Sequence, residues 1–386
     1  MNANKYWKFT GIAVAQIFAG SIVMVVLAPY FSSLGYSESW ISAVFGLFPL
    51  LMAATGLLLG ELSDEMSRSY IIRAALLGTA AAYLLYWLGW ESSIITGRVL
   101  DAVSFSALVI VLFAKIQDVV DPSLRGRYTG IFLSLRDGAR VLGPLAGGFL
   151  ADKYIGLPFV VAVVVLLLAA FSLRSVKNHQ KSRLAVHPLR SLKRFFLDAR
   201  LLPVAVLGPL INGLLPLFNV FLPLLIVNEL GLSYAAVGAA ASAYMVGHVS
   251  QFFFGELVDR YGELRFMLAG SLLTCLLLLL VPQFGASFYS LLVLVLLIGV
   301  CSAMWSVACL EYLSRVGAEQ SRGVVLGTYV SISKLGEATA YFTASVVVLF
   351  FGVAGVFYVL ASLGILGVVL ASLLFARANS RLASSA

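Results

Sequence analysis

Seven ionisable residues lie inside apolar stretches of this chain, where a charged side chain is costly and usually has a function. They are Arg98, Asp101, Arg136, Asp137, Arg140, Lys334 and Glu337. Each of the three acids could bind and release a proton in apolar surroundings, or serve as the fixed partner of a neighbouring cation. Because four cations face three acids, the set is balanced or mildly positive, which suits an anionic or zwitterionic ligand.

The spacing of these residues predicts which of them share a helix face. Arg136 and Arg140 are four residues apart, and side chains at this spacing lie next to each other along a helix. Lys334 and Glu337 are three residues apart and meet in the same way. Each pair is therefore expected on one face of its helix.

Arg98 and Asp101 are also three residues apart, so they can neutralise each other on one helix face. Arg98 lies close to the predicted outer end of its helix. Its guanidinium could therefore extend to the membrane interface instead of serving inside the protein. Both readings stay open at this point.

The composition identifies an integral membrane protein. Of 386 residues, 61% are hydrophobic and 11% charged, and the mean hydropathy is +1.00, far from the averages of soluble domains. Uncharged runs long enough to cross a hydrocarbon core of about 30 Å as helices recur along the chain. The clearest runs cover residues 9–30, 39–60, 74–90, 154–173, 201–228 and 230–255.

Two longer apolar runs, 266–310 and 338–376, must each fold back once, because one span cannot use so many residues. Turn residues mark the breaks, in PQFGASF (282–288) and FGVAG (351–355). Two further spans, 93–116 and 128–151, carry a few charges on an apolar background. The sum is twelve transmembrane helices.

The basic residues are distributed unevenly between the two predicted sides of the membrane. With twelve spans, 21 of the 26 Lys and Arg residues fall on the side that carries both termini, and only Lys153 falls on the other. The positive-inside rule places that basic side in the cytoplasm. We therefore expect a multi-pass protein of the cell's cytoplasmic membrane with both termini cytoplasmic. This distribution also accounts for the net charge of +8 without a nucleic-acid partner.

The densest basic segment, residues 174–200, lies at the middle of the chain. It predicts an N-terminal six-helix bundle over 1–175, a basic cytoplasmic linker over 176–200 and a C-terminal six-helix bundle over 201–386. Part of the linker could lie on the membrane surface as a basic amphipathic helix. A solvated charged loop is the alternative.

Two short motifs occur twice. GELSDEMSR (60–68) returns 195 residues later as GELVDRYGELR (255–265), and RGRYTG (125–130) returns 197 residues later as RGVVLG (322–327). Independent motifs at nearly the same offset indicate an internal duplication.

On these motifs the chain resembles the major facilitator superfamily over its whole length, and in particular the drug/proton antiporters with twelve helices. The signature GxLxDrxGrr of that family is matched by Gly60, Leu62, Asp64 and Arg68, and again by Gly255, Leu257, Asp259, Arg260, Gly262 and Arg265. In the first copy, Ser67 replaces a glycine and Glu65 a basic residue. The resemblance implies an all-α membrane protein of twelve transmembrane helices in two pseudo-symmetric six-helix bundles.

The resemblance also implies that the duplicated loop is a gate on the inner side. Arg68 would pair with Asp118, and Arg260 or Arg265 would pair with Glu311. These contacts would hold the gate shut in one state and release it in the other. A short loop at a membrane surface needs small residues and a helix-capping Asp in any case, so the Gly and Asp residues alone have a simpler explanation.

Two further segments resemble motifs of the same family. GRVLDAVSFSA resembles the helix 4 motif RxxxGxG, whose arginine is associated with proton coupling; Ala102 and Ser104 occupy its glycine positions. The antiporter motif of helix 5 is matched by Gly130, Gly143, Pro144, Gly147 and Gly148, with Ala139 in place of a glycine. Small residues also let helices pack closely and Pro bends them, so packing is the alternative; the motif favours export.

We expect a secondary transporter that moves a small molecule by alternating access, with proton-coupled efflux as the first hypothesis. Proton-coupled uptake or facilitated passage of an organic anion or a sugar-like metabolite is the alternative. The first helix carries no acid, only Gln16 and Ser21, whereas many multidrug exporters have a charge there. Weaker candidates for lining a cavity are Asn212, Asn219, Tyr244, His248, Gln251 and Trp305.

Other classes of protein fit the sequence less well. It has no GxxxxGK[ST] loop for an ATP-driven pump, and its three His residues do not form the cluster that a membrane enzyme would need. Cys275, Cys301 and Cys309 lie in apolar segments, so neither disulfides nor a metal site is indicated. We expect no enzyme activity and no cofactor, the proton gradient as the energy source, and a monomer surrounded by lipid.

Overall fold

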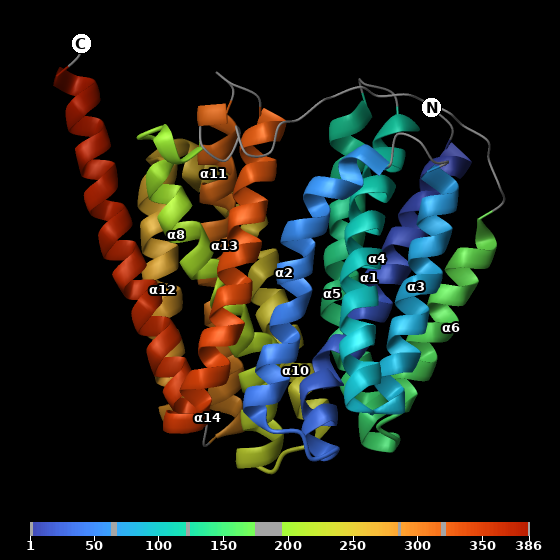
Figure 1. Cartoon of the computed structure of the whole chain (residues 1–386). Coiled ribbons are helices and arrows are strands. Elements are labelled where there is room, and N and C mark those ends of the chain that lie inside the picture. Colours follow the sequence, from blue (N-terminus) through green and yellow to red (C-terminus); the bar gives the residue numbers. More distant parts are fainter. Residues whose placement is uncertain are drawn as a thin grey trace. The chain divides into compact units, whose positions relative to one another are not determined.

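The computed structural model describes residues 3–62, 68–120, 124–173, 195–284, 287–317 and 322–384. Within these ranges the regular structure is helical (Figure 1). This suits so apolar a chain, because a helix satisfies its backbone polar groups within its own segment. Eight helices of the described part are long and apolar enough to cross a membrane. The count of twelve spans in two six-helix bundles stays a prediction.

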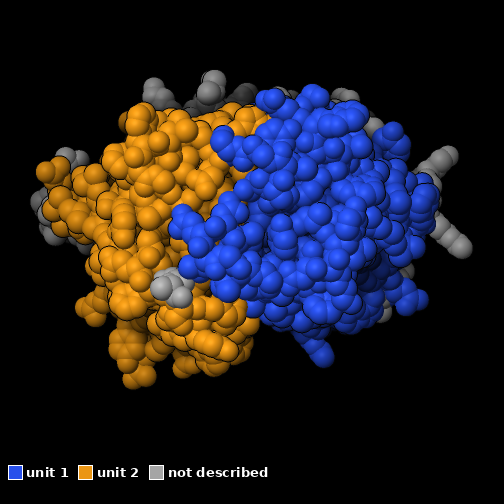
Figure 2. All heavy atoms as spheres, turned by 90° about the horizontal axis from the view of Figure 1, so that it is seen from below, with its two compact units in different colours: residues 1–37, 54–183, 226–242 blue, residues 38–53, 184–225, 243–386 orange. Residues whose placement is uncertain are grey.

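The chain forms two compact units, coloured separately in Figure 2. The first contains residues 1–37, 54–183 and 226–242, and the second contains residues 38–53, 184–225 and 243–386. Each unit thus combines most of one half of the chain with a short segment of the other half. Residues 174–194, which include most of the predicted linker, lie outside the described part, so the predicted division at 176–200 stays a prediction.

The first unit is built around five helices that lie wholly within it. They are α1 (Ala3–Ser33), α3 (Arg68–Leu88), α4 (Glu91–Asp118), α5 (Arg125–Lys153) and α6 (Leu157–Ser172). Helix α1 packs against α5 and α6, and α3 packs along α4 and against α6. The α3–α4 pair holds the most buried charges of the unit, as described below.

The second unit contains α8 (Leu202–Asn212), α11 (Gln251–Tyr261), α12 (Glu263–Phe284), α13 (Phe288–Gly317) and α14 (Arg322–Ser384). Helix α14 packs along α8 and α12, and α12 packs along α13. Two more helices, α2 (Glu38–Leu62) and α10 (Tyr234–Val249), are divided between the units.

Both breaks predicted within the long apolar runs are confirmed. Helix α12 ends at Phe284 and α13 begins at Phe288, around the predicted turn at 282–288. Helix α14 is interrupted at Gly352, whose φ of 65° and ψ of −174° are not helical. A residue with a side chain rarely adopts this backbone conformation, so glycine is required at the turn.

The predicted span 201–228 is less regular than its apolar sequence suggests. After α8 it continues as two π-helical segments, η2 (Leu217–Phe221) and η3 (Leu225–Glu229), joined by the short α9 (Leu222–Leu224). Pro216 and Pro223 precede or begin two of these segments and cannot donate the backbone hydrogen bonds of an α-helix. Such π-helical turns occur frequently at functional sites.

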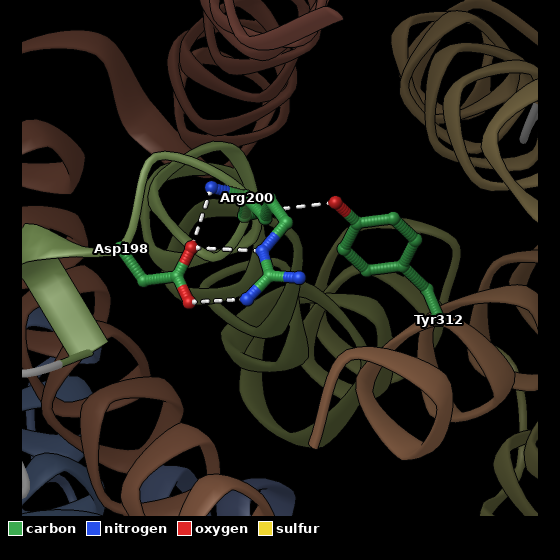
Figure 3. Close-up of polar contacts among 3 residues, drawn as sticks. All are labelled: Asp198, Arg200 and Tyr312. Carbon is green, nitrogen blue, oxygen red and sulfur yellow. Dashed lines mark hydrogen bonds and ion pairs between the residues drawn. The ribbon is translucent and has the colours of Figure 1, made fainter. Parts of the chain in front are cut away.

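A polar cluster fixes the start of α8 (Figure 3). The Asp198 carboxylate accepts hydrogen bonds from the main-chain N–H of Arg200 at 2.9 Å and from its Nε and Nη2 at 3.3 Å each. The Tyr312 hydroxyl donates to the Arg200 carbonyl at 2.8 Å. Since Tyr312 belongs to α13, the cluster ties the beginning of α8 to that helix.

Candidate functional site

Both predicted site residues on α4 are deeply buried. Arg98 is 1% exposed and Asp101 is 7% exposed. The Tyr86 hydroxyl of α3 donates a hydrogen bond to Asp101 Oδ2 at 3.0 Å. The Arg98 guanidinium acts on the same carboxylate electrostatically and also hydrogen-bonds Tyr86. The Arg98 side chain therefore lies inside the protein, and its position relative to the membrane interface stays a prediction.

The packing of α3 on α4 explains how Tyr86 reaches this site. Gly97 lies directly under the Tyr86 ring, where an added Cβ would be 2.8 Å from Cε1. Tyr83, one turn earlier on α3, stacks on Tyr86 with 6.0 Å between ring centroids. The two tyrosines were missed by reasoning from the sequence, although their spacing of three residues in an apolar helix places both hydroxyls on one face.

The charges on α5 form a local cluster. Arg136 contacts its neighbour Asp137 through Nη2 and Nε, each 2.8 Å from Oδ1, and Arg140 Nη1 lies 4.0 Å from the same oxygen. The cluster is less buried than that of α4, and the Arg140 side chain is 44% exposed. Arg136 and Arg140 thus converge on one carboxylate.

On α14, Lys334 Nζ lies 2.6 Å from Glu337 Oε2. Glu337 is buried and Lys334 is partly exposed. The contact places the two side chains together, as their spacing predicts. Gly336, between them in sequence, lies against Pro209 of α8, which holds this part of α14 close to α8.

The first copy of the duplicated loop lies largely outside the described residues. Gly60 is near the end of α2, Arg68 begins α3 and Asp118 ends α4, but their side chains and all of Asp64 are outside the described part. Their pairing therefore stays a prediction.

The second copy of the loop is described completely. Gly255, Asp259 and Arg260 lie on α11 and Arg265 on α12, and all but Gly255 are exposed. Arg260 lies over the ring of Tyr261, 5.4 Å from its centroid. The turn between the helices depends on Gly262, whose φ of 90° favours glycine.

An ion pair of α12 with α13 lies beside this copy, but it joins residues other than the expected ones. Arg315 Nη2, in the last turn of α13, pairs with Glu263 in the first turn of α12. Among the described residues no ion pair joins Glu311 to Arg260 or Arg265. Acids near a helix start and cations near a helix end are favourable, which explains the observed pair. The role of Glu311 stays a prediction.

The glycine motif of α5 packs against two other helices. A Cβ at Gly143 would lie 2.5 Å from the Ser21 Cβ of α1, and one at Gly147 would collide with the Ile22 carbonyl of the same helix. A Cβ at Gly148 would collide with the Tyr234 carbonyl at the start of α10. Gly130 has no atom within 4 Å of such a Cβ. Close packing thus explains three of the four glycines.

Contacts of α5 with α10 were not foreseen from the sequence. The Asp152 carboxylate accepts hydrogen bonds from the main-chain N–H groups of Tyr234 at 2.7 Å and Ala235 at 3.2 Å, at the start of α10. Further along, the Ser242 hydroxyl donates to the Val141 carbonyl at 2.7 Å. Asp152 therefore caps a helix from another part of the chain.

An equivalent contact joins α2 to α14. The Ser42 hydroxyl donates to the Tyr341 carbonyl at 2.8 Å. Gly46 packs closely on Tyr341, since a Cβ added at Gly46 would lie 3.0 Å from the Tyr341 Cβ. Helices α2 and α10 each lead toward one copy of the duplicated loop, and α5 and α14 each begin with one copy of the RGxxxG motif.

The weaker polar candidates form hydrogen bonds within the second unit. Asn212 Nδ2 lies 3.4 Å from the Tyr329 hydroxyl, and Asn219 Nδ2 donates to the Tyr341 hydroxyl at 2.9 Å. The hydroxyls of Tyr244 and Ser302 are 2.9 Å apart. No group of three or more His, Cys, Asp or Glu residues suited to a metal ion occurs in the part of the chain that the structure describes.

Comparison with known proteins gives similarities over the whole chain. The sequence profile described as Major Facilitator Superfamily matches residues 9–218 and 201–385. Multidrug resistance protein 2 of Bacillus subtilis is 24% identical over 341 residues, which cover 85% of this chain and 84% of that protein.

Two other resistance proteins are similar to a comparable degree. Chloramphenicol resistance protein CraA of Acinetobacter baumannii is 25% identical over 305 residues, 75% of this chain and 73% of that protein. Quinolone resistance protein NorA of Staphylococcus aureus is 23% identical over 333 residues, 83% of this chain and 84% of that protein.

The similarity extends to the fold of solved structures. The nucleoside transporter NupG superimposes with a TM-score of 0.79 at 12% identity, over 97% of this chain and 99% of that one. The peptide transporter PepTSo gives a TM-score of 0.79 at 12% identity, over 98% and 99%. At these identities the likeness concerns the fold alone.

Proposed function

Because the chain belongs to the Major Facilitator Superfamily and is a membrane transporter and not an enzyme, we propose that it exports a small molecule in exchange for protons. Export would proceed by alternating access across the cytoplasmic membrane. The chain would work as a monomer in the bilayer, with both termini cytoplasmic, and the proton gradient would supply the energy.

The proton part of the proposal is carried by one observation, the buried pair of Arg98 and Asp101 on α4. Ionisable groups at this depth are costly, so a chain retains them mainly where their charge changes during function. The groups on α5 and α14 supply further charges that a substrate could contact. Arg140 in particular is the most exposed of them.

The nature of the substrate is proposed from the relatives. Their names refer to multidrug, chloramphenicol and quinolone resistance, so we infer export of drug-like compounds that carry an aromatic ring. Uptake or facilitated passage of an organic anion stays the second candidate, since two arginines of α5 converge on the single carboxylate of Asp137.

The duplicated loop is proposed to be the inner gate. In the first copy Asp64 and Arg68 would form the latch with Asp118. In the second copy Asp259 would take part, and Arg260 or Arg265 would pair with Glu311. The ion pair of Glu263 with Arg315 supports the view that charges cross between helices on this side of the second unit.

The function can be tested in a host strain that lacks its own drug exporters. Cells that express the chain should accumulate less chloramphenicol or norfloxacin, and an uncoupler should remove the difference. In proteoliposomes, an imposed pH gradient should drive transport of the drug against its concentration gradient. Movement in the same direction as the protons would instead support uptake, and no drug movement at all would contradict the proposal.

A further inference from the structure

We propose that Asp101 is the acid that carries the coupling proton and that Tyr86 positions its carboxylate for the exchange. The proposal rests on the proton-coupled export put forward above. It selects one of the three acids in the predicted helices, and it adds a residue that lies on another helix and outside every motif of the sequence.

The contacts of the three acids separate Asp101 from the others. Asp137 lies 2.8 Å from the guanidinium of Arg136, and Glu337 lies 2.6 Å from the ammonium of Lys334. A cation in direct contact favours the ionised carboxylate and opposes proton uptake. Asp101 instead accepts its hydrogen bond from the neutral Tyr86 hydroxyl.

The groups that face Asp101 come from two helices. Arg98 lies on its own helix, and Tyr86 and Tyr83 lie on α3. The positive charge of Arg98 favours the ionised carboxylate, whereas burial among aromatic rings favours the neutral one. With these effects opposed, a modest change in the surroundings of Asp101 can switch its protonation.

The Tyr86 hydroxyl suits both protonation states. A hydroxyl can donate or accept a hydrogen bond, so it donates to Asp101 when the carboxylate is ionised and can accept from the carboxyl when that group is neutral. Arg98 also hydrogen-bonds Tyr86. Its guanidinium therefore keeps a polar partner after the charge of Asp101 is neutralised, which lowers the cost of proton binding.

The site is closed to solvent in this structure. Tyr86 is fully buried, and the Phe31 ring of α1 packs on it with 6.1 Å between centroids. A proton can reach or leave Asp101 Oδ only when the surrounding helices separate. The chemical step is one proton moving from water to the carboxylate on one side and from the carboxyl to water on the other, with no other bond changed. Closure between these events prevents protons from leaking.

Three substitutions test the assignment in proteoliposomes with chloramphenicol as the probe. Asp101→Asn cannot bind the proton, so an imposed pH gradient should no longer drive accumulation, while drug exchange without a gradient continues. Asp101→Glu keeps an acid and should restore part of the driven transport. Tyr86→Phe should move the midpoint of the transport–pH profile upward by about 0.5–1 pH unit, because the ionised carboxylate loses its donor.

Tyr83→Phe is the matched control. It makes the same change one turn away on the same helix, in a side chain that is also buried, and it leaves the hydrogen bond from Tyr86 to Asp101 in place. Its pH profile should stay that of the unmodified protein. A purely structural role of Tyr86 would lower the thermal unfolding temperature of Tyr86→Phe and leave its pH midpoint unchanged.

The outcomes separate this inference from the proposed function. If the unmodified protein moves no drug in response to a pH gradient, the proposed function fails and the inference fails with it. If the pH gradient drives drug transport equally well in the unmodified protein and in Asp101→Asn, only the inference is overturned. Equal pH midpoints for Tyr86→Phe and Tyr83→Phe would overturn the role of Tyr86 alone.

Discussion

At the scale of single residues, the buried side chains of α3 and α4 depend on one another. Arg98 and Asp101 carry opposite charges in a nearly solvent-free surrounding, and Tyr86 contacts both. Removing one member leaves the others with unsatisfied charge or hydrogen-bonding groups, and this is far more costly than removing an exposed ion pair.

Replacement of Arg98 by Gln should therefore destabilise the protein strongly. Removing one of two opposite charges that are buried near each other costs about 3–5 kcal/mol, because the remaining charge is left without compensation. Thermal unfolding in detergent would measure the change. The double variant Arg98→Gln with Asp101→Asn, which removes both charges, should recover a large part of the stability. Equal stability of the single and double variants would contradict the electrostatic coupling.

Reasoning from the sequence located the charges of this site but not its hydroxyl group. The spacing of Arg98 and Asp101 predicts a shared helix face, because helical periodicity is a local property. Tyr86 reaches Asp101 across an interface between two helices, and the rotation of one helix relative to another is set by packing, which no short motif encodes. Gly97 is the residue that makes this approach possible.

At the scale of helices, α5 combines charges with a face of small residues. Its glycines let α1 and the start of α10 come close, and Asp152 near its end caps α10. The glycines form a motif in the sequence, whereas Asp152 belongs to none of the motifs. Its partners are backbone groups 82 and 83 residues away, and such contacts leave no pattern in the sequence.

The packing role of the α5 glycines predicts a difference between two of them. Gly147→Ala would place a methyl group against the Ile22 carbonyl and should cost about 1–3 kcal/mol. Gly130→Ala would place the same group in open space and should leave stability unchanged or slightly higher, since Ala favours helix formation. Parallel thermal unfolding of the two variants is the measurement. Similar losses in both would argue against packing as the reason for the motif.

Asp152→Ala should loosen the first turn of α10. The amides of Tyr234 and Ala235 lose the acceptor that they share, and the loss of such a cap costs about 1 kcal/mol. Hydrogen–deuterium exchange of a peptide covering 230–240 should accelerate about fivefold. Asp259→Ala, at an exposed acid of α11, serves as a control and should leave that peptide unchanged.

At the scale of the whole molecule, composition was the most informative property. The apolar runs predicted a helical membrane protein, and turn residues located the breaks at 282–288 and 351–355 correctly. The π-helical segments after α8 could not be foreseen, because hydropathy describes how apolar a segment is and does not give its number of residues per helical turn. The grouping into two compact units likewise depends on contacts between distant segments.

The 21 basic residues assigned to one side predict the orientation of the chain in the membrane. A green fluorescent protein fused after Ala386 should fluoresce, because the positive-inside rule places the C-terminus in the cytoplasm. An alkaline phosphatase fused at the same place should be inactive. The opposite pair of results would reverse the proposed topology, and the gate would then lie on the outer side.

The contacts of Ser42 and Ser242 have a consequence for the internal repeat of the chain. Helix α2, which leads to the first copy of the charged loop, forms a hydrogen bond with α14, which begins with the second copy of the RGxxxG motif. Helix α10, which leads to the second copy of the loop, forms one with α5, which begins with the first copy of that motif. Two identical subunits related by a two-fold axis make this kind of reciprocal contact. These two contacts therefore repeat within one chain, at equivalent positions of the duplicated sequence, as the contacts across a two-fold axis do.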